Sequence, residues 1–166
     1  MIFVTVGTHE QQFNRLIECI DELKTSGEIS DEVVVQSGFS DYVPKSCKWQ
    51  KLFGYEEMSK LVSQADIIIT HGGPASFIAA LQVGKIPIVV PRKAAFNEHV
   101  NDHQVQFCTA VEEKYGNIIL VEDISKLKET IQNYAEIVSL RTGKFESNNA
   151  SFNSRFEEIV SKLIGE

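Results

Sequence analysis

The segment ADIIITHGGPAS, which runs from Ala65 to Ser76, carries most of the information about the fold of this chain. Its first half is a short run of apolar, mostly β-branched residues, which is typical of a strand buried on both faces of a parallel sheet. Two glycines end that run, and Pro74 suits the first turn of a helix. The segment therefore predicts a buried strand that turns sharply into a helix, as in a βαβ unit.

Strand and helix signals alternate along the rest of the chain. Apolar runs predict strands at residues 2–6, 33–36, 52–53, 65–70, 86–90 and 118–121. Helical spacing predicts a helix that opens with a capping box at Thr8 and Gln11, and further helices at residues 56–64, 75–84, 98–113, 124–140 and 152–163. The alternation predicts an α/β fold, a single doubly wound, Rossmann-like parallel sheet, in one domain over residues 1–166.

The charge balance and the cysteine content restrict the class of protein. The formal net charge is -7, and the sequence shows no basic patch of the kind that binds nucleic acid or anionic lipid. The three cysteines, Cys19, Cys47 and Cys108, are typical of reduced thiols in the cytosol. The first residues do not resemble a signal peptide, and no apolar run approaches the roughly 20 residues of a membrane span. We therefore expect a cytoplasmic protein that approaches a membrane only through a partner.

The loop after the strand at 65–70 is the strongest candidate for a ligand site. In parallel α/β sheets, ligands bind beyond the carboxyl ends of the strands. Gly72 and Gly73 let backbone approach a ligand at the start of a helix, where free N–H groups bind phosphate. The side chains of His71 and Ser76 can donate hydrogen bonds to the same anion. The alternative is a tight turn with a structural histidine and a capping serine.

Several further motifs stand in a fixed order along the chain. The first set is Phe53-Gly54-Tyr55-Glu56-Glu57-Met58, then Ala65 to Gly73, then Gly84-Lys85-Ile86-Pro87. This set resembles the C-terminal domain of family 28 glycosyltransferases, which include the MurG-type peptidoglycan N-acetylglucosaminyltransferases. The second set is Phe3 to Phe13 (FVTVGTHEQQF) and Asn97 to Gln104 (NEHVNDHQ). It resembles the catalytic small subunits of two-component bacterial capsular and exopolysaccharide glycosyltransferases. The resemblance covers about residues 1–121, and the predicted helices of residues 122–166 add little.

The resemblance implies a specific enzyme. Family members are halves of the two-domain GT-B fold, and this half binds a UDP-sugar, which is a substrate, so that no cofactor is expected. A membrane-attached partner supplies the acceptor-binding half, and the acceptor is a sugar on a lipid diphosphate. The implied activity is inverting glycosyl transfer in capsular or exopolysaccharide synthesis, at the inner face of the cell membrane. Galactose as the donor sugar rests only on the likeness to capsular polysaccharide enzymes.

The resemblance also assigns candidate site residues. The family's His-x-Gly-x-x-Ser pattern, which contacts the diphosphate, falls on His71, Gly73 and Ser76, with Gly72 beside them. The region that holds uracil falls on Phe53, Gly54, Tyr55 and Met58. The residues that bind the donor sugar fall on His103 and Gln104, with Glu98 as a further candidate.

One position departs from the family pattern. The family commonly has a glutamate three residues after the motif serine, where its carboxylate accepts both ribose hydroxyls. Here that position is Ala79, which accepts nothing. Either Glu98 or another group takes over that role, or the ribose is held more loosely.

The catalytic groups are less determined by the sequence. His9 and Glu10 follow the first strand, and two interpretations stay open: they belong to the reaction centre, or they are solvated residues in a first helical turn. Arg92, next to Lys93, can stabilise the leaving UDP or can belong to a solvated loop pair. A metal site at His99 and His103 is not expected, because no third ligand is fixed by spacing.

Two other functions remain open at this point. A nucleotide-sugar-binding regulatory subunit would share the phosphate loop without catalysing transfer, and the alanine at position 79 favours this alternative. An enzyme resembling UDP-sugar 2-epimerases would use the same half-fold and would also need a second domain. In the transferase interpretation, the general base lies either on the partner or at His9 or Glu10.

Overall fold

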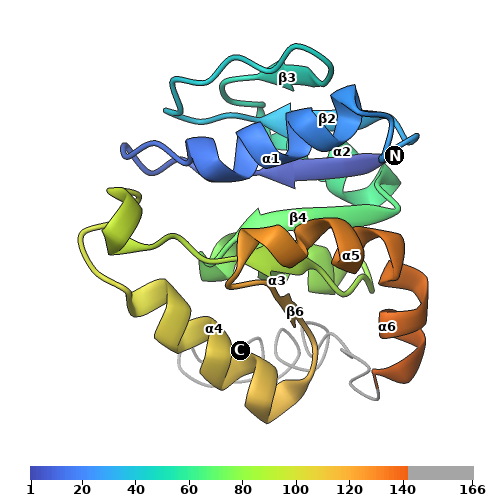
Figure 1. The fold of residues 1–166 in the computed structure, drawn as a ribbon. Helices are drawn as coiled ribbons and strands as arrows, with labels where there is room; N and C mark the ends of the chain where they lie inside the picture. The colour runs from blue at the N-terminus through green and yellow to red at the C-terminus, as the bar shows by residue number, and fades with distance from the viewer. Residues whose placement is uncertain (142–166) are drawn as a thin grey trace, which may run out of the picture.

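The computed structural model describes residues 1–141, and within them six parallel strands form one sheet (Figure 1). The strand order is β3-β2-β1-β4-β5-β6. The strands are β1 (Ile2–Thr5), β2 (Val33–Gln36), β3 (Lys48–Gln50), β4 (Ile67–His71), β5 (Ile88–Val90) and β6 (Ile119–Leu120). The connections therefore run outward in opposite directions from β1 and β4, which is the doubly wound arrangement expected from the sequence. The predicted helix at 152–163 lies outside the described residues.

The central strands are buried on both faces, as their apolar runs require. β1 pairs with β2 on one side and with β4 on the other, so that Val4 lies opposite both Val35 and Ile69. Side chains alternate between the two faces: Val4 packs in one apolar cluster, and Phe3, one residue earlier, packs in another. Because both faces of the sheet bury apolar side chains, helices must cover both of them.

Helices cover the sheet on both sides in the way shown in Figure 1, where α1 and α5 lie in front of it and α2 and α3 behind it. The helices are α1 (Asn14–Thr25), α2 (Tyr55–Gln64), α3 (Pro74–Gln82), α4 (His103–Tyr115), α5 (Leu127–Gln132) and α6 (Tyr134–Leu140), with short 3-10 helices η1 (Ala94–Phe96) and η2 (Ile124–Lys126). α4 packs on α3 and β5 through a third cluster that includes Cys108 and Phe77.

Two helices begin later than the sequence predicts. α1 begins at Asn14 and not at Thr8, and the six residues before it form a loop without regular structure. α4 begins at His103 and not at residue 98, because Asn97 adopts a left-handed conformation with φ 55° and turns the chain after η1. Both corrections lengthen loops at the carboxyl end of the sheet, where a ligand site is expected.

Two further elements also differ from expectation. The third strand lies at Lys48–Gln50 and not at residues 52–53, which follow it as part of the loop. The helix predicted over 124–140 is divided into η2, α5 and α6, with the break between the last two at Asn133. Short apolar runs and amphipathic spacing locate these elements only approximately.

A buried carboxylate organises the loop between β2 and β3. Asp21 on α1 is 1% exposed, and its oxygens accept hydrogen bonds from the Tyr42 hydroxyl and from the backbone N–H groups of Lys45 and Ser46, each at 2.8 Å. Burial alone raises the pKa of Asp21, but these donors more than offset it, so that the net pKa lies below the ordinary value of 3.8. The ionised carboxylate therefore supplies the acceptors that the backbone N–H groups of this loop would otherwise find in a helix or strand.

We expect Asp21→Ala to lower the free energy of unfolding by about 3 kcal/mol, because three donors lose a charged, buried acceptor. Urea unfolding followed by circular dichroism at pH 7 measures this. Asp41→Ala is the matched control: Asp41 is exposed in the same loop, and its loss should cost no more than about 0.5 kcal/mol. Equal effects of the two substitutions would contradict the role given to Asp21.

Candidate functional site

A cleft of about 450 Å³ opens at the carboxyl end of the sheet. It lies where β1 and β4 are neighbours, at the point from which the connections run in opposite directions. Open α/β sheets bind ligands at such switch points. The lining comes from the ends of β1 and β2 and from the loops that follow β1, β3 and β4.

His71, the last residue of β4, is held between two glycine backbones. A Cβ atom on Gly7 would lie 2.4 Å from its Cε1, and one on Gly73 would lie 2.3 Å from its Nε2. Either contact is far shorter than atoms tolerate, so any other residue at these two positions would displace the imidazole. Gly7 also has a φ of 76°, which favours glycine for a second reason. Gly73, which the sequence suggested for a ligand, therefore also makes room for this ring.

The His71 imidazole is neutral at physiological pH. Its side chain is 9% exposed, and burial together with the nearby positive charge of Arg92 lowers its pKa to about 4. Its Nδ1 has no hydrogen-bond partner among residues 1–141. A neutral ring at the cleft can offer one N–H donor or one acceptor nitrogen to a ligand.

Buried polar side chains join the loops beneath the cleft. The Thr5 hydroxyl oxygen accepts hydrogen bonds from the Gly7 N–H at 3.2 Å and from Gln36 Nε2 at 3.1 Å. The other end of the Gln36 amide accepts from the Phe53 N–H at 3.3 Å. This chain of bonds connects the ends of three strand segments and sets the positions of the loops relative to one another.

The start of α3 forms the anion-binding side of the cleft. Gly73 precedes the helix, Pro74 occupies its first position, and Ser76 lies one turn in with its N–H bonded to the Gly73 carbonyl at 3.1 Å. Pro74, Ala75 and Ser76 all line the cleft. A helix N-terminus carries partial positive charge, and none of the residues that line this cleft is Asp or Glu. The electrostatics therefore favour a negatively charged ligand.

Gly72 has a different role from the one expected. Its N–H donates to Gln104 Oε1 at 3.1 Å and is therefore not free for a diphosphate. A Cβ atom there would lie 2.9 Å from Cys108 Sγ, so the absent side chain makes room for α4. This corrects the assignment of Gly72 to the anion site, whereas His71, Gly73 and Ser76 line the cleft together.

The candidate uracil residues divide into two pairs. Phe53 and Met58 line the cleft, with Leu52 beside them. Gly54 and Tyr55 do not: Gly54 is the residue before α2, and the Tyr55 side chain is 87% exposed. The structure thus gives one side of the cleft an apolar wall, and Tyr55 points elsewhere.

The three donor-sugar candidates lie outside the cleft lining. Gln104 Oε1 accepts from the N–H groups of Gly72 and Arg92, both at 3.1 Å. His103 is exposed, and its ring stacks on Phe107 with centroids 6.4 Å apart.

Glu98 is a structural residue, which corrects its assignment to the sugar or the ribose. Its side chain is 0% exposed, and both oxygens accept from Arg15 at 2.9 Å. One of them also accepts from the Lys93 N–H at 3.0 Å. A carboxylate that accepts three hydrogen bonds and has no exposed surface is not presented to a ligand in the cleft.

Arg92 also lies away from the ligand side of the cleft. Its side chain is 0% exposed, and its Nη atoms donate to the carbonyls of Val6, Gln11, Gln12 and Glu98 at 2.8–3.0 Å. This burial excludes direct contact with a leaving group, and stabilisation of leaving UDP by Arg92 stays a prediction. Its charge still acts through space, since it contributes to the lowered pKa of His71.

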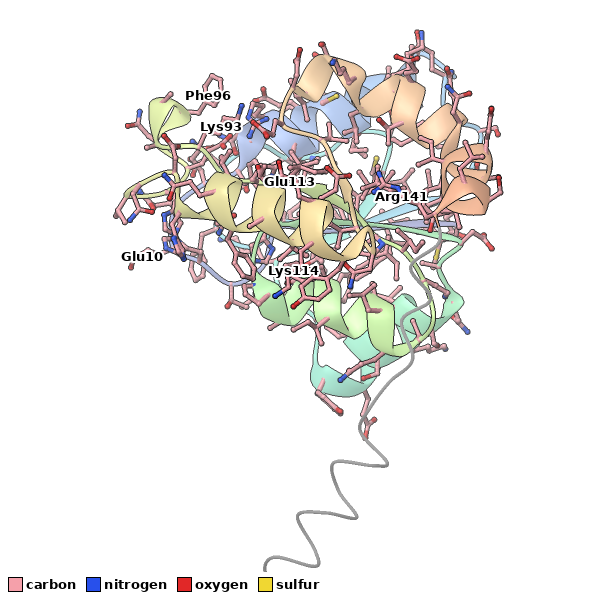
Figure 2. The ribbon with its side chains drawn as sticks, turned by 90° about the horizontal axis from the view of Figure 1, so that it is seen from below. Glu10, Lys93, Phe96, Glu113, Lys114 and Arg141 are labelled. Carbon is pink, nitrogen blue, oxygen red and sulfur yellow. The ribbon has the colours of Figure 1, made fainter. Side chains whose placement is uncertain are left out.

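Neither His9 nor Glu10 lines the cleft, although Gly7 and Thr8 just before them do. His9 lies at the rim, near enough for its charge to contribute to the lowered pKa of His71. His9 Nδ1 accepts from the Gln11 N–H at 3.2 Å, and its ring lies 5.0 Å from that of His99. Burial, Arg92 and His99 lower the pKa of His9. Glu10 is exposed and projects outward at the end of the molecule where Lys93 and Phe96 lie (Figure 2).

Sequence reasoning missed three polar residues of the cleft, Thr5, Thr8 and Gln36. A signal was present for two of them, because Thr5 and Gln36 are the only polar residues of β1 and β2 and stand at their carboxyl ends. Among residues 1–141, no three His, Cys, Asp or Glu side chains lie together as metal ligands. The described helices also include none with the length and apolar character to cross a membrane.

Comparison with known proteins identifies the relatives of this chain. It matches the glycosyltransferase family 28 C-terminal domain over residues 1–163. It is 32% identical over 119 residues to the UDP-N-acetylglucosamine--N-acetylmuramyl-(pentapeptide) pyrophosphoryl-undecaprenol N-acetylglucosamine transferase of Bdellovibrio bacteriovorus, covering 68% of this chain and 31% of that protein. It is 31% identical over 108 residues to the UDP-N-acetylglucosamine transferase subunit ALG13 of Mus musculus, covering 58% of this chain and 9% of that protein. The matched part is thus less than a third of either relative.

A solved structure supports the fold. The glycotransferase of kitacinnamycin superposes with a TM-score of 0.55 at 19% identity, covering 85% of this chain and 34% of that chain. The predicted fold class, a doubly wound parallel sheet of the kind found in one half of GT-B glycosyltransferases, is confirmed, and so is the resemblance to family 28.

We expect His71 to make stability depend on pH. Its folded pKa of about 4 lies below the ordinary value of 6.5, so the unfolded chain binds more protons between these values. The free energy of unfolding should therefore fall as pH decreases from about 6.5 toward 4, by about 3 kcal/mol in total. Urea unfolding across this range measures it.

The His71→Gln variant should lose this part of the pH dependence, and His103→Gln, which changes an exposed histidine, should keep it. A wild-type protein with the same stability at pH 6.5 and pH 4.5 would contradict the buried, neutral state of His71.

Proposed function

The chain belongs to the glycosyltransferase family 28 C-terminal domains, and on that premise we propose that it is the catalytic, nucleotide-sugar-binding subunit of a UDP-sugar-dependent glycosyltransferase. One observation carries the proposal: a cleft whose lining among residues 1–141 holds no carboxylate lies at the switch point of the sheet, with a neutral histidine and the N-terminus of α3 on one side. The same cleft has an apolar wall on its other side. A nucleoside diphosphate matches both sides: its diphosphate is an anion that suits the start of α3, and its planar base suits the apolar wall.

The diphosphate is proposed to bind at the start of α3. The helix N-terminus, the Ser76 hydroxyl and an N–H of neutral His71 supply donors, and the buried charge of Arg92 adds a favourable potential behind them. Because His71 is neutral before binding, it recognises the diphosphate by a hydrogen bond and not by a full charge. The close approach of ligand to backbone at Gly73 requires the absence of a side chain.

The base is proposed to bind between Phe53 and Met58. These side chains line the cleft beside the Gln36 amide, whose two ends are already bonded to Thr5 and to the Phe53 N–H. The polar groups there are satisfied, so the wall offers mainly apolar contact. Ala79 offers no carboxylate to the ribose, and buried Glu98 does not replace it, which supports a loosely held ribose.

In the proposed reaction, an acceptor hydroxyl attacks the anomeric carbon of the UDP-sugar with inversion. The new glycosidic bond forms as the bond from that carbon to the diphosphate oxygen breaks, and UDP leaves with the electron pair. The hydroxyl proton passes to a general base. His71, Ser76 and the N-terminus of α3 stabilise the negative charge that develops on the leaving diphosphate.

We propose that a second, membrane-attached subunit supplies the acceptor, a sugar on a lipid diphosphate. The chain matches only 31% and 9% of the two relatives above, and the second relative is itself called a subunit. His9 remains a candidate for the base because it lies close to His71 at the rim, and Glu10 because it follows His9 in the same loop. Galactose as the donor and a role in capsular or exopolysaccharide synthesis belong to the same proposal.

A non-catalytic, nucleotide-sugar-binding subunit is the second candidate. It is favoured by the absence of Asp and Glu from the residues that line the cleft, which leaves no carboxylate there to act as a base. Transfer from UDP-galactose by the reconstituted pair separates the two candidates. His71→Ala should abolish transfer if this chain is catalytic, and transfer at the wild-type rate would assign catalysis to the partner.

We expect calorimetry to show that UDP binds one site per chain, more tightly than UMP or uridine, because the second phosphate adds contacts at α3. Ser76→Ala should weaken UDP binding by about tenfold, the loss of one hydrogen bond to a charged group. Ser59→Ala, which removes an exposed hydroxyl from α2, should leave the affinity unchanged. Equal affinities for UDP and uridine, in wild type and in Ser76→Ala, would exclude a diphosphate site at α3.

A further inference from the structure

Arg92 is the largest fully buried side chain with a formal charge. Its Nη1 donates to the carbonyls of Gln11, Gln12 and Glu98, and its Nη2 donates to the carbonyl of Val6. Its guanidinium also lies over the Phe13 ring, 4.8 Å from the centroid. Every one of these partners except Glu98 belongs to the segment between β1 and α1.

That segment has little structure of its own. Residues 8–13 form neither helix nor strand, so their carbonyls have no regular partners. Gln12 Nε2 donates to the Phe96 carbonyl at 2.9 Å, and the His9–Gln11 bond is local. The Phe13 N–H donates to Ser40 Oγ at 3.0 Å, and the Arg92 guanidinium binds three backbone carbonyls of the segment. Each buried carbonyl left without a donor costs about 1–3 kcal/mol.

The same residue connects this loop to other loops at the carboxyl end of the sheet. The Arg92 N–H donates to Gln104 Oε1, which also accepts from the Gly72 N–H at the end of β4. Glu98, whose carbonyl Arg92 binds, is in turn held by Arg15 of α1. Three loops at the carboxyl end of the sheet thus meet at one residue that has no exposed surface.

We propose that Arg92 is a positioning residue for nucleotide binding: its guanidinium holds the β1–α1 loop in the one course that places Gly7 and Thr8 in the cleft wall and His9 at its rim. This inference rests on the proposed function for the identity of the ligand. The role differs from contact with the leaving group, since the side chain donates to backbone oxygens and has no surface at the cleft.

The shape of the guanidinium explains why arginine is needed. The four carbonyls are bound by both Nη atoms of Arg92, which the planar guanidinium holds in a fixed geometry. A lysine ammonium at this position would keep the charge but would bind fewer of the carbonyls from a single point. Charge and geometry can therefore be separated by substitution.

The test compares Arg92→Lys and Arg92→Met with the wild type and with Asp21→Ala. Asp21→Ala serves as the control for lowered stability, because its contacts lie in the β2–β3 loop and not at Arg92. Three properties are measured at pH 7 and 10 °C: amide hydrogen exchange of residues 6–13, UDP affinity by calorimetry, and the NMR titration of the His71 imidazole.

We expect both Arg92 variants to lose amide protection in residues 6–13 while β1 and β4 stay protected. UDP affinity should fall by about tenfold or more, because only a small fraction of the molecules then has the β1–α1 loop in the conformation that binds UDP. In Arg92→Met, the pKa of His71 should rise because a neighbouring positive charge has gone. In Arg92→Lys the charge stays, so the pKa should rise less. Asp21→Ala should match the wild type in UDP affinity, in the titration of His71 and in the protection of residues 6–12. Phe13 is left out of this comparison, because its N–H donates to Ser40 Oγ in the β2–β3 loop that Asp21 holds.

Protected loop amides and wild-type UDP affinity in Arg92→Lys would overturn the proposal, and so would a loss of loop protection in Asp21→Ala equal to that in the Arg92 variants. If the wild type does not bind UDP, the proposed function fails. The exchange and titration measurements still decide in that case whether Arg92 positions the loop.

Discussion

The cleft depends on one steric constraint, the enclosure of the His71 ring between the backbones of Gly7 and Gly73. A Cβ atom at either glycine would collide with the ring, so the end of β1 and the start of α3 can both pack against the imidazole only without side chains at these positions. The enclosure also removes water from the imidazole and keeps it neutral. The packing of His71 between the two glycines thus explains its burial, the positions of the two loops and the neutral imidazole that an anion would meet.

Much of the fold was predictable because it follows from local patterns. A run such as ADIIIT is typical of a strand buried on both faces, and the strands and helices around it alternate in the order that builds a parallel sheet. The errors fell where long-range contacts decide. The helix expected at Thr8 begins only at Asn14, because the intervening residues bond to Arg92, which lies about eighty residues away in the chain.

The candidate site was predictable to a similar extent and for similar reasons. His71, Gly73 and Ser76 share one loop, so their spacing alone brings them together at the cleft. Gly72, Arg92 and Glu98 also lie in loops at the carboxyl end of the sheet, but their hydrogen-bond partners come from other elements and no spacing reveals them. Sequence patterns indicate which groups are available, and tertiary contacts decide which of them remain free to meet a ligand.

The central claim is that this enclosed histidine and the start of α3 hold the diphosphate of a sugar nucleotide. A crystal structure of the UDP complex tests it most directly. The account predicts the diphosphate within hydrogen-bond distance of His71 and the Ser76 hydroxyl, with the base against Phe53 and Met58. UDP bound at another surface, with His71 still unpartnered, would contradict it.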